Sequence, residues 1–220
     1  MSSAPGLPPA FADRGWKEVS RDSKDELDLP FFSIRSHNAV YRHESVAHLS
    51  ELIAVGVDAG PRSVFTTALE FSPPLSDFGV DPASVFGVAR RHARREFARS
   101  IREDGLSDVT RTDARWTDRD DGGRARAFRY EVGFPLVPSA VLSDPGGVGS
   151  LTLRGVLWAG IWPTDDAYAM AGGIYPDETI ADAVDRQAPG AGAGTDPYVE
   201  LDRATHRREV AAVIQSAGID

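Results

Sequence analysis

The chain has 220 residues, 41% of them hydrophobic, and a formal net charge of −9 at pH 7. This length and apolar content suit one domain with a single core. Cysteine is absent, which excludes disulfides, thiol nucleophiles and cysteine-ligated metals, and no apolar run approaches the 18 residues expected of a membrane span.

The ionic composition favours a protein of a salt-adapted cytoplasm. Lys17 and Lys24 are the only lysines, all other cationic side chains are arginine, and aspartate outnumbers glutamate two to one. High net charge of one sign keeps chains apart and repels itself, and salt screens that repulsion. Codon usage in a GC-rich genome is the alternative explanation. The start of the chain has no basic and apolar signal segment, and the negative balance disfavours nucleic acid as a partner.

Residues 1–14 contain three prolines among small residues and predict a disordered N-terminal segment before a single domain over 15–187. The patterns that follow predict a short strand at 16–21, a strand over 31–43, a helix over 44–55 and a strand over 64–71.

A long helix over 82–104 is the clearest element. Asp81 can cap it, Pro82 suits its first position, and Gly105 can close it. At 100° per residue its apolar side chains form one stripe, and four arginines gather on the opposite side: Arg91, Arg95, Arg99 and Arg102.

The second half of the chain predicts four strands in hairpin succession, at 108–117, 124–136 and twice within 151–176, with DRDDGG at 118–123 as the first turn. A short helix over 177–186, a flexible linker over 188–200 and a helix over 201–217 complete the chain. Short hairpins imply antiparallel pairing, so we expect an α+β fold: one antiparallel sheet of six or seven strands with the 82–104 helix packed on it.

The 151–176 hairpin is expected at the centre of this sheet. If residues 163–166 form its loop, Trp158 lies opposite Ala171 and Trp162 opposite Ala167, on the face away from the long helix. Two large rings over small residues either fill a second layer or leave a slot for a ligand or partner.

Several segments together resemble a family of uncharacterised proteins from salt-loving archaea. The matching pieces span roughly 15–176 and leave 188–220 outside: GW at 15–16, VYRHES at 40–45, FTTALEFSPPL at 65–75, ARREFARSIREDGLSDV at 93–109 and LWAGIWPTDDAYAMAGGIYP at 157–176. The order of elements is also similar to the Mog1/PsbP-like fold of accessory and adaptor proteins. The resemblance implies no catalytic residues.

The sequence contains no recognisable motif for catalysis, cofactor binding or metal binding. His43 and His48 are five positions apart, whereas a zincin helix needs a spacing of four, and the carboxylates of 118–123 lack the ligand spacing of a calcium loop. The functional interpretation of the arginine face is docking to an acidic partner or a phosphate-bearing ligand. The alternative, which an acidic chain favours, is a solvated helix face paired with local aspartate and glutamate.

We therefore expect a non-enzymatic binding or adaptor protein without cofactor or metal, whose partner is an unidentified protein or small ligand. A third hypothesis is a homodimer formed through an exposed strand edge, and neither nucleic acid nor a membrane is expected as a partner. The alternative is a small-ligand carrier or enzyme with a pocket beside the 151–176 hairpin, lined by Trp158 or Trp162.

Overall fold

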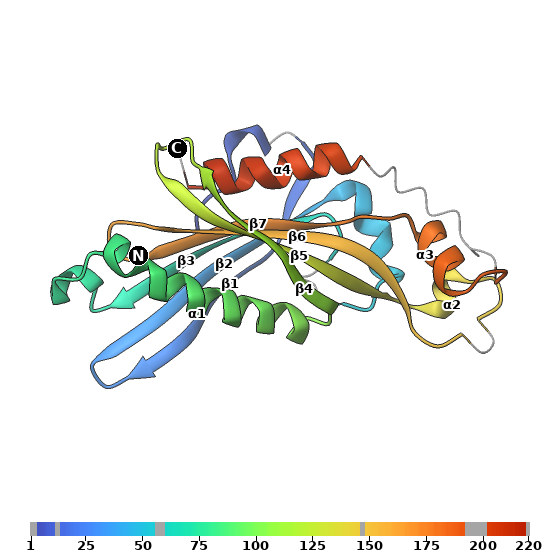
Figure 1. Ribbon diagram of the computed structural model, residues 1–220, viewed down its shortest axis with the longest axis horizontal. Coiled ribbons are helices and arrows are strands. Elements are labelled where there is room, and N and C mark those ends of the chain that lie inside the picture. Colours follow the sequence, from blue (N-terminus) through green and yellow to red (C-terminus); the bar gives the residue numbers. More distant parts are fainter. Residues whose placement is uncertain (1–3, 12–13, 56–59, 146–147, 192–201, 219–220) are drawn as a thin grey trace.

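A computed structural model describes residues 4–11, 14–55, 60–145, 148–191 and 202–218. It contains one open antiparallel sheet of seven strands in the order β1-β2-β3-β7-β6-β5-β4 (Figure 1). The strands are β1 (Trp16–Leu29), β2 (Phe32–His43), β3 (Ser63–Ser72), β4 (Ser107–Asp118), β5 (Arg124–Leu136), β6 (Leu151–Pro163) and β7 (Tyr168–Pro176). The α-helices of the described residues are α1 (Pro82–Glu103), α2 (Pro138–Val141), α3 (Ile180–Gln187) and α4 (Arg203–Ser216). The predicted α+β fold with one antiparallel sheet is confirmed.

β7 is the middle strand of the sheet, and β6 lies beside it, as predicted for the 151–176 hairpin. Nearly every residue of these two strands is buried because helices cover both faces of the sheet at this point. None of the helices in the described ranges has the length and apolarity that crossing a membrane requires.

The first face of the sheet carries the larger core and is covered by α1, as predicted. Asp81 caps this helix by accepting a hydrogen bond from the backbone N–H of Ala83 at 3.0 Å, and Gly105 follows it with φ +98°. The phenol of Tyr168 on β7 donates to the carbonyl of Pro82 at 3.0 Å. The most deeply buried side chains of this core include Phe134, Leu151, Leu153, Ile161 and Val184.

The second face carries a smaller core beneath α4. Val210, Val213 and Ile214 of this helix pack against Trp158 and Trp162. The C-terminal helix that the sequence predicts over 201–217 is therefore part of the domain's packing, and in Figure 1 it lies on the opposite side of the sheet from α1. Most of the predicted linker, 192–200, lies outside the described residues.

The beginning of the chain differs from the disordered segment predicted for residues 1–14. Residues 4–11 lie along the second face, where the side chain of Phe11, at the end of the 3₁₀-helix η1 (Pro9–Phe11), is only 3% exposed. The hydroxyl of Thr66 donates to the carbonyl of Pro5 at 2.6 Å, and the N–H of Gly218 donates to the carbonyl of Gly6 at 3.2 Å. These long-range contacts hold the segment, and proline content alone could not reveal them. Residues 1–3 and 12–13 lie outside the described ranges.

Two further predicted elements have different extents. The expected helix over 44–55 is the 3₁₀-helix η2 (Glu44–Glu51), because the chain beyond it pairs with the end of β5: Ala54 N–H donates to Pro135 and Val137 N–H to Leu52, both at 2.9 Å. The short strand predicted at 16–21 extends to Leu29. Its second half, for which the sequence predicted no strand, is an exposed edge strand whose charged side chains give no alternating signal.

The register of the central hairpin differs by two residues from the predicted one. Trp158 pairs with Gly173 and Trp162 with Ala169, because the turn lies at 164–167, where the N–H of Thr164 donates to the carbonyl of Ala167 at 3.1 Å. Since side chains alternate with a period of two, an even shift leaves each residue on its predicted face.

Candidate functional site

Trp158 and Trp162 both lie on the second face of β6, and each is 6% exposed. An arginine from the edge strand β4 stacks on each ring. The guanidinium carbon of Arg115 lies 4.4 Å from the centroid of Trp158, and that of Arg119 lies 3.8 Å from the centroid of Trp162. A guanidinium over the face of an indole is held by the ring's quadrupole.

The two stacked arginines are in very different surroundings. Arg119 is 6% exposed, and its guanidinium donates to the carbonyls of Ile214 and Ala217 at 2.8 and 3.0 Å. It therefore satisfies acceptors that the last turn of α4 leaves open, and it closes the space over Trp162. Arg115 is exposed, and no carboxylate of the described residues lies within ion-pair distance of it.

A small cavity lies beside Trp158, between the sheet and α4. Its volume is about 30 Å³, and its walls are formed by Arg115, Thr117, Ala127, Trp158, Arg207, Ala211 and Ile214. Pockets for drug-sized ligands occupy roughly 300–1,000 Å³. This cavity is therefore suited to a single small chemical group rather than to a whole cofactor or substrate. Of the two predicted slot residues, the structure places Trp158 at an opening and Trp162 beneath a closed layer.

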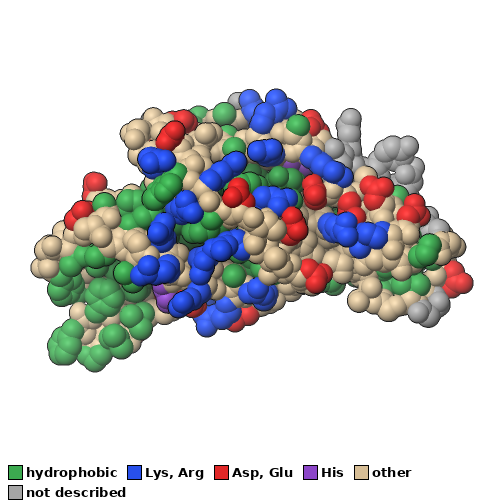
Figure 2. Space-filling view, viewed as in Figure 1, with side chains coloured by type: hydrophobic (Ala, Val, Ile, Leu, Met, Phe, Trp, Pro, Cys, Tyr) green, Lys and Arg blue, Asp and Glu red, His purple; other side chains and the backbone are tan. Residues whose placement is uncertain are grey.

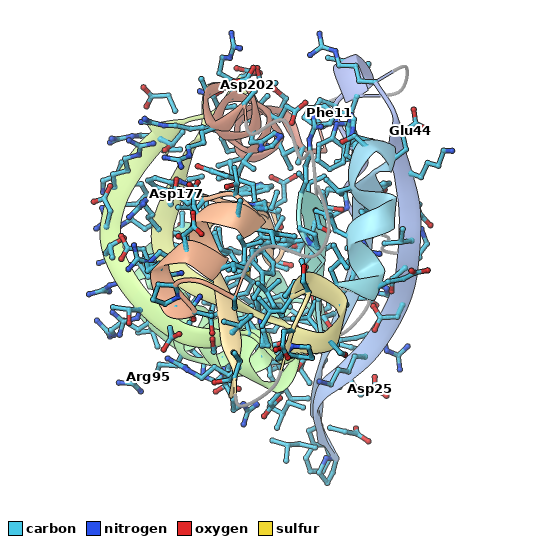
Figure 3. The ribbon with its side chains drawn as sticks, turned by 90° about the vertical axis from the view of Figure 1, so that its right-hand side faces the viewer. Phe11, Asp25, Glu44, Arg95, Asp177 and Asp202 are labelled. Carbon is cyan, nitrogen blue, oxygen red and sulfur yellow. The ribbon has the colours of Figure 1, made fainter. Side chains whose placement is uncertain are left out.

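The four predicted arginines of α1 divide into two pairs. Arg99 forms ion pairs with Glu96 and Glu103, and the guanidinium of Arg102 donates to the carbonyls of Ala98 and Val109. By contrast Arg91 and Arg95 are exposed, and neither has an ion pair or hydrogen bond with a described residue. Arg95 lies at the opposite side of the molecule from Asp202, the residue that caps α4 (Figure 3).

Arginine side chains form a continuous band on one side of the molecule. Figure 2 shows cationic side chains running from α4 across β4 and β5 to α1. Residues 90–129 contain 12 of the 22 arginines but only eight of the 33 acidic residues, a local balance of +4 in a chain of −9. We use the name arginine band for its exposed members whose guanidinium has neither an ion pair nor a hydrogen bond with a described residue: Arg91, Arg95, Arg111, Arg115 and Arg207.

Three of these five arginines were not predicted from the sequence. Arg111 and Arg115 lie on a strand with a weak hydrophobic pattern. Arg207 lies 92 positions beyond Arg115, on a helix predicted to follow a flexible linker, and the sequence did not show whether that helix docks on the domain. The local excess of arginine over residues 90–129 is the signal that could have found the first two.

A second polar cluster, also missed, lies where the N-terminal half of α4 meets β2 and β3. Arg62 and Glu209 form an ion pair at 3.0 Å whose side chains are 14% and 10% exposed, and Arg62 also donates to the hydroxyl of Ser45 at 2.8 Å. Burial, aided by the charge of Arg62, lowers the pKa of His206 to about 4 and also lowers the pKa of His43. This cluster joins segments far apart in the sequence and has no local signature.

Metal binding has no geometric support in the described part of the chain, where acidic and histidine side chains do not form a group able to hold an ion. His43 instead shares a hydrogen bond of 2.8 Å with the hydroxyl of Ser45 at the start of η2.

Comparison with known families assigns the chain to one of them. The model of the family described as "Domain of unknown function (DUF6517)" matches residues 5–217. The chain belongs to this family. The match confirms the expected membership in an uncharacterised family, and it extends well beyond residue 176, where the resemblance found in the sequence ended. No curated protein and no solved structure matches the chain.

Proposed function

We propose that the protein is a non-enzymatic binding or adaptor protein that docks an acidic protein surface against its arginine band. The observation that carries this proposal is the exposure of Arg91 and Arg95 without a carboxylate partner among the described residues, in a chain with nine more acidic than basic side chains. Carboxylates are abundant on the rest of the molecule, yet those described do not neutralise this surface.

Arginine suits such a surface at high salt, and we further propose that the protein works in a salt-adapted cytoplasm. At 1 M ionic strength charges are screened within about 3 Å, so attraction at a distance contributes little. Direct guanidinium–carboxylate contacts persist because the planar guanidinium can donate two parallel hydrogen bonds to one carboxylate. The scarcity of lysine, the short acidic side chains and the resemblance to proteins of salt-loving archaea support this setting.

An acidic protein is a better partner for this surface than nucleic acid. Binding to a phosphate backbone is dominated by a positive electrostatic footprint, and the net charge of −9 opposes the approach of a long polyanion. An acidic protein surface that contacts only the arginine band is close to few of the chain's carboxylates and is therefore repelled less than a long polyanion would be. The similarity in element order to the Mog1/PsbP-like adaptors also supports a binding role.

The helix α1 offers a matched pair of variants for the test. Arg91→Gln/Arg95→Gln removes two unpartnered guanidiniums, whereas Arg99→Gln/Arg102→Gln removes two that are already engaged within the chain. Both double variants change the net charge equally, and both should leave the free energy of unfolding almost unchanged, because exposed pairs contribute about 0–1 kcal/mol each.

The measurement is the Kd of a labelled polyglutamate peptide, by fluorescence anisotropy, at low and at molar potassium chloride. We expect the Arg91/Arg95 variant to bind at least about tenfold more weakly, a loss of about 1.4 kcal/mol, and the Arg99/Arg102 variant to bind within about threefold of the parent. Equal losses in both variants would show a general charge effect and contradict the proposal. Tighter binding of an oligonucleotide of equal charge would point to nucleic acid instead.

A further inference from the structure

The cavity beside Trp158 brings two cationic side chains from distant elements to one small space. Arg115 comes from β4 and Arg207 from α4, and both line the cavity together with the hydroxyl-bearing Thr117. Neither guanidinium has an ion pair or hydrogen bond with a described residue. Two like charges at one opening repel each other, and a bound anion would relieve that repulsion.

The walls of the cavity favour an anion that makes few but directional contacts. Trp158 forms an apolar side, and its ring already holds the guanidinium of Arg115 at 4.4 Å from the centroid, which restricts the directions in which this group can donate. Ala127, Ala211 and Ile214 provide the remaining apolar surface. A partly water-excluded site strengthens each hydrogen bond to a charged acceptor.

The volume limits the ligand group further. A water molecule needs roughly 10–15 Å³ of cavity volume, so the cavity of about 30 Å³ accommodates about two oxygen-sized atoms. A carboxylate group presents two oxygens in one plane, the shape that a guanidinium recognises by paired hydrogen bonds. A tetrahedral phosphate group is larger and presents its oxygens in three dimensions.

We propose that the cavity lined by Arg115, Thr117, Trp158 and Arg207 is a binding pocket for a single carboxylate group. The carboxylate belongs either to a small organic acid or to an acidic side chain of a protein partner. Arg115 and Arg207 belong to the arginine band, so this inference deepens the proposed docking function. The pocket does not involve Arg91 or Arg95, so loss of acetate binding here and loss of peptide docking at α1 are measured with different variants.

The experiment follows the indole N–H resonance of Trp158 by NMR, assigned with Trp158→Phe, during titration with sodium acetate at constant ionic strength. Sodium chloride and inorganic phosphate are titrated in parallel, and the polyglutamate peptide is a further arm. We expect saturable shifts with acetate, with a Kd on the order of millimolar because one group makes a few half-exposed contacts. Saturation by acetate identifies a free acid as sufficient, whereas saturation by the peptide alone assigns the carboxylate to a partner protein.

Three variants decide whether the response comes from this pocket. Arg115→Gln and Arg207→Gln should each weaken acetate or peptide binding at least about tenfold. Ala211→Leu keeps every charge but fills the cavity, and it should abolish the response. Arg124→Gln is the matched control, because this arginine is also exposed and stacks on a different ring, that of Trp116 at 5.2 Å.

Three results would overturn the proposal. Equal, non-saturating shifts with acetate and chloride would show ionic screening only. Saturation by phosphate alone would refute the carboxylate assignment. A response that survives Ala211→Leu, or that Arg124→Gln reduces as much as Arg115→Gln does, would place binding outside the cavity. A folded, unresponsive Ala211→Leu variant, verified by its unchanged amide spectrum elsewhere, would support the proposal.

Discussion

One nitrogen of Arg62 donates to both carboxylate oxygens of Glu209, at 3.0 and 3.2 Å, across 147 positions of the sequence. Arg62 immediately precedes β3 and has φ +49°, an unusual value for a residue other than glycine. Glu209 is in the middle of α4. The ion pair therefore links the C-terminal helix to the start of β3, which lies in the first half of the sequence. Both side chains are largely shielded from water.

Removing the charge of Glu209 should destabilise the protein strongly. Glu209→Gln keeps the shape of the side chain but leaves the guanidinium of Arg62 largely buried without its counter-charge, and we expect a loss of about 3 kcal/mol in the free energy of unfolding, measured with urea. Glu96→Gln is the control, since it breaks the exposed pair with Arg99 and should cost less than about 1 kcal/mol. Equal losses in the two variants would show that the buried ion pair contributes no more to the free energy of unfolding than an exposed one. The double variant Arg62→Met/Glu209→Leu should recover much of the loss, because it removes both charges together.

Acidification should weaken the same region through His206. Its ring is 3% exposed, lies 5.8 Å from the ring of Tyr175, and faces the charges of Arg62, Asp202 and His43. Burial lowers the pKa of His206 to about 4, whereas an unfolded chain has a pKa of about 6.5. Between these two pKa values the unfolded state therefore binds a proton on His206 that the folded state does not bind. The stabilisation is complete above pH 6.5 and is lost as the pH falls from 6.5 towards 4, by about 2 kcal/mol at pH 5.

The check is urea denaturation at pH 7.5 and pH 5.0. His206→Phe, which removes the titrating ring, should lose about 2 kcal/mol less between these two pH values than the parent protein does. His92→Gln, which replaces an exposed histidine of α1, is the control for the loss of a histidine away from this cluster. A residual slope in His206→Phe is expected, because burial also lowers the pKa of His43. An unchanged slope would mean that His206 is not the group responsible.

Arg119 should be important for the attachment of the last turn of α4. Its side chain is 3% exposed, its guanidinium donates to two carbonyls at the end of the helix, and it stacks on Trp162. Arg119→Ala leaves those acceptors unsatisfied, and we expect a loss of about 3 kcal/mol together with faster hydrogen exchange of α4 amides. Arg124→Ala, an exposed arginine of the same hairpin, should cost no more than about 0.5 kcal/mol. Unchanged exchange in α4 after Arg119→Ala would refute this role.

The sequence predicted most reliably those elements whose signals are local. The Asp81 cap, Pro82 and Gly105 bound α1 within a single segment, and alternating side chains identify β5 and the faces of β6 and β7. Features that depend on distant partners were missed. Phe11 is buried in the core of the second face, where its ring lies 5.6 Å from that of Trp16, and β1 continues past Arg21 because β2 pairs with it.

The same distinction explains the candidate site. The arginine face of α1 is visible as a helical pattern, but the division between engaged Arg102 and unpartnered Arg95 depends on the carbonyl of Val109 in β4. Trp158 was predicted to face either a second layer or a slot. Arg207, which lines the cavity there, comes from a helix that follows the predicted flexible linker, so the sequence did not place it beside Trp158.

A substitution at Gly172 tests the observed register of the hairpin, which differs by two residues from the predicted one. A Cβ placed on Gly172 would lie 2.1 Å from the backbone oxygen of Trp158 and 2.8 Å from a ring carbon of Phe65. The first contact is with backbone, which cannot move aside without disturbing the pairing of β6 and β7. We expect Gly172→Ala to cost about 3 kcal/mol in the free energy of unfolding, the upper end of the usual range for overpacking, because the nearest atom belongs to the backbone.

For Gly87→Ala, the same chemical change at another position, we expect the free energy of unfolding to rise instead of fall. Gly87 lies within α1, and a Cβ there would have nothing within 4 Å apart from its chain neighbours and the adjacent backbone of its own helix. Alanine is favoured over glycine inside a helix, so this variant should gain about 0.5–1 kcal/mol. Both changes are measured by urea denaturation and thermal unfolding of the full chain. A Gly172→Ala protein as stable as the parent would require a different pairing of β6 with β7, and with it a different set of neighbours for Trp158. A severe loss at Gly172 beside a gain at Gly87 would support the register on which the Trp158 cavity depends.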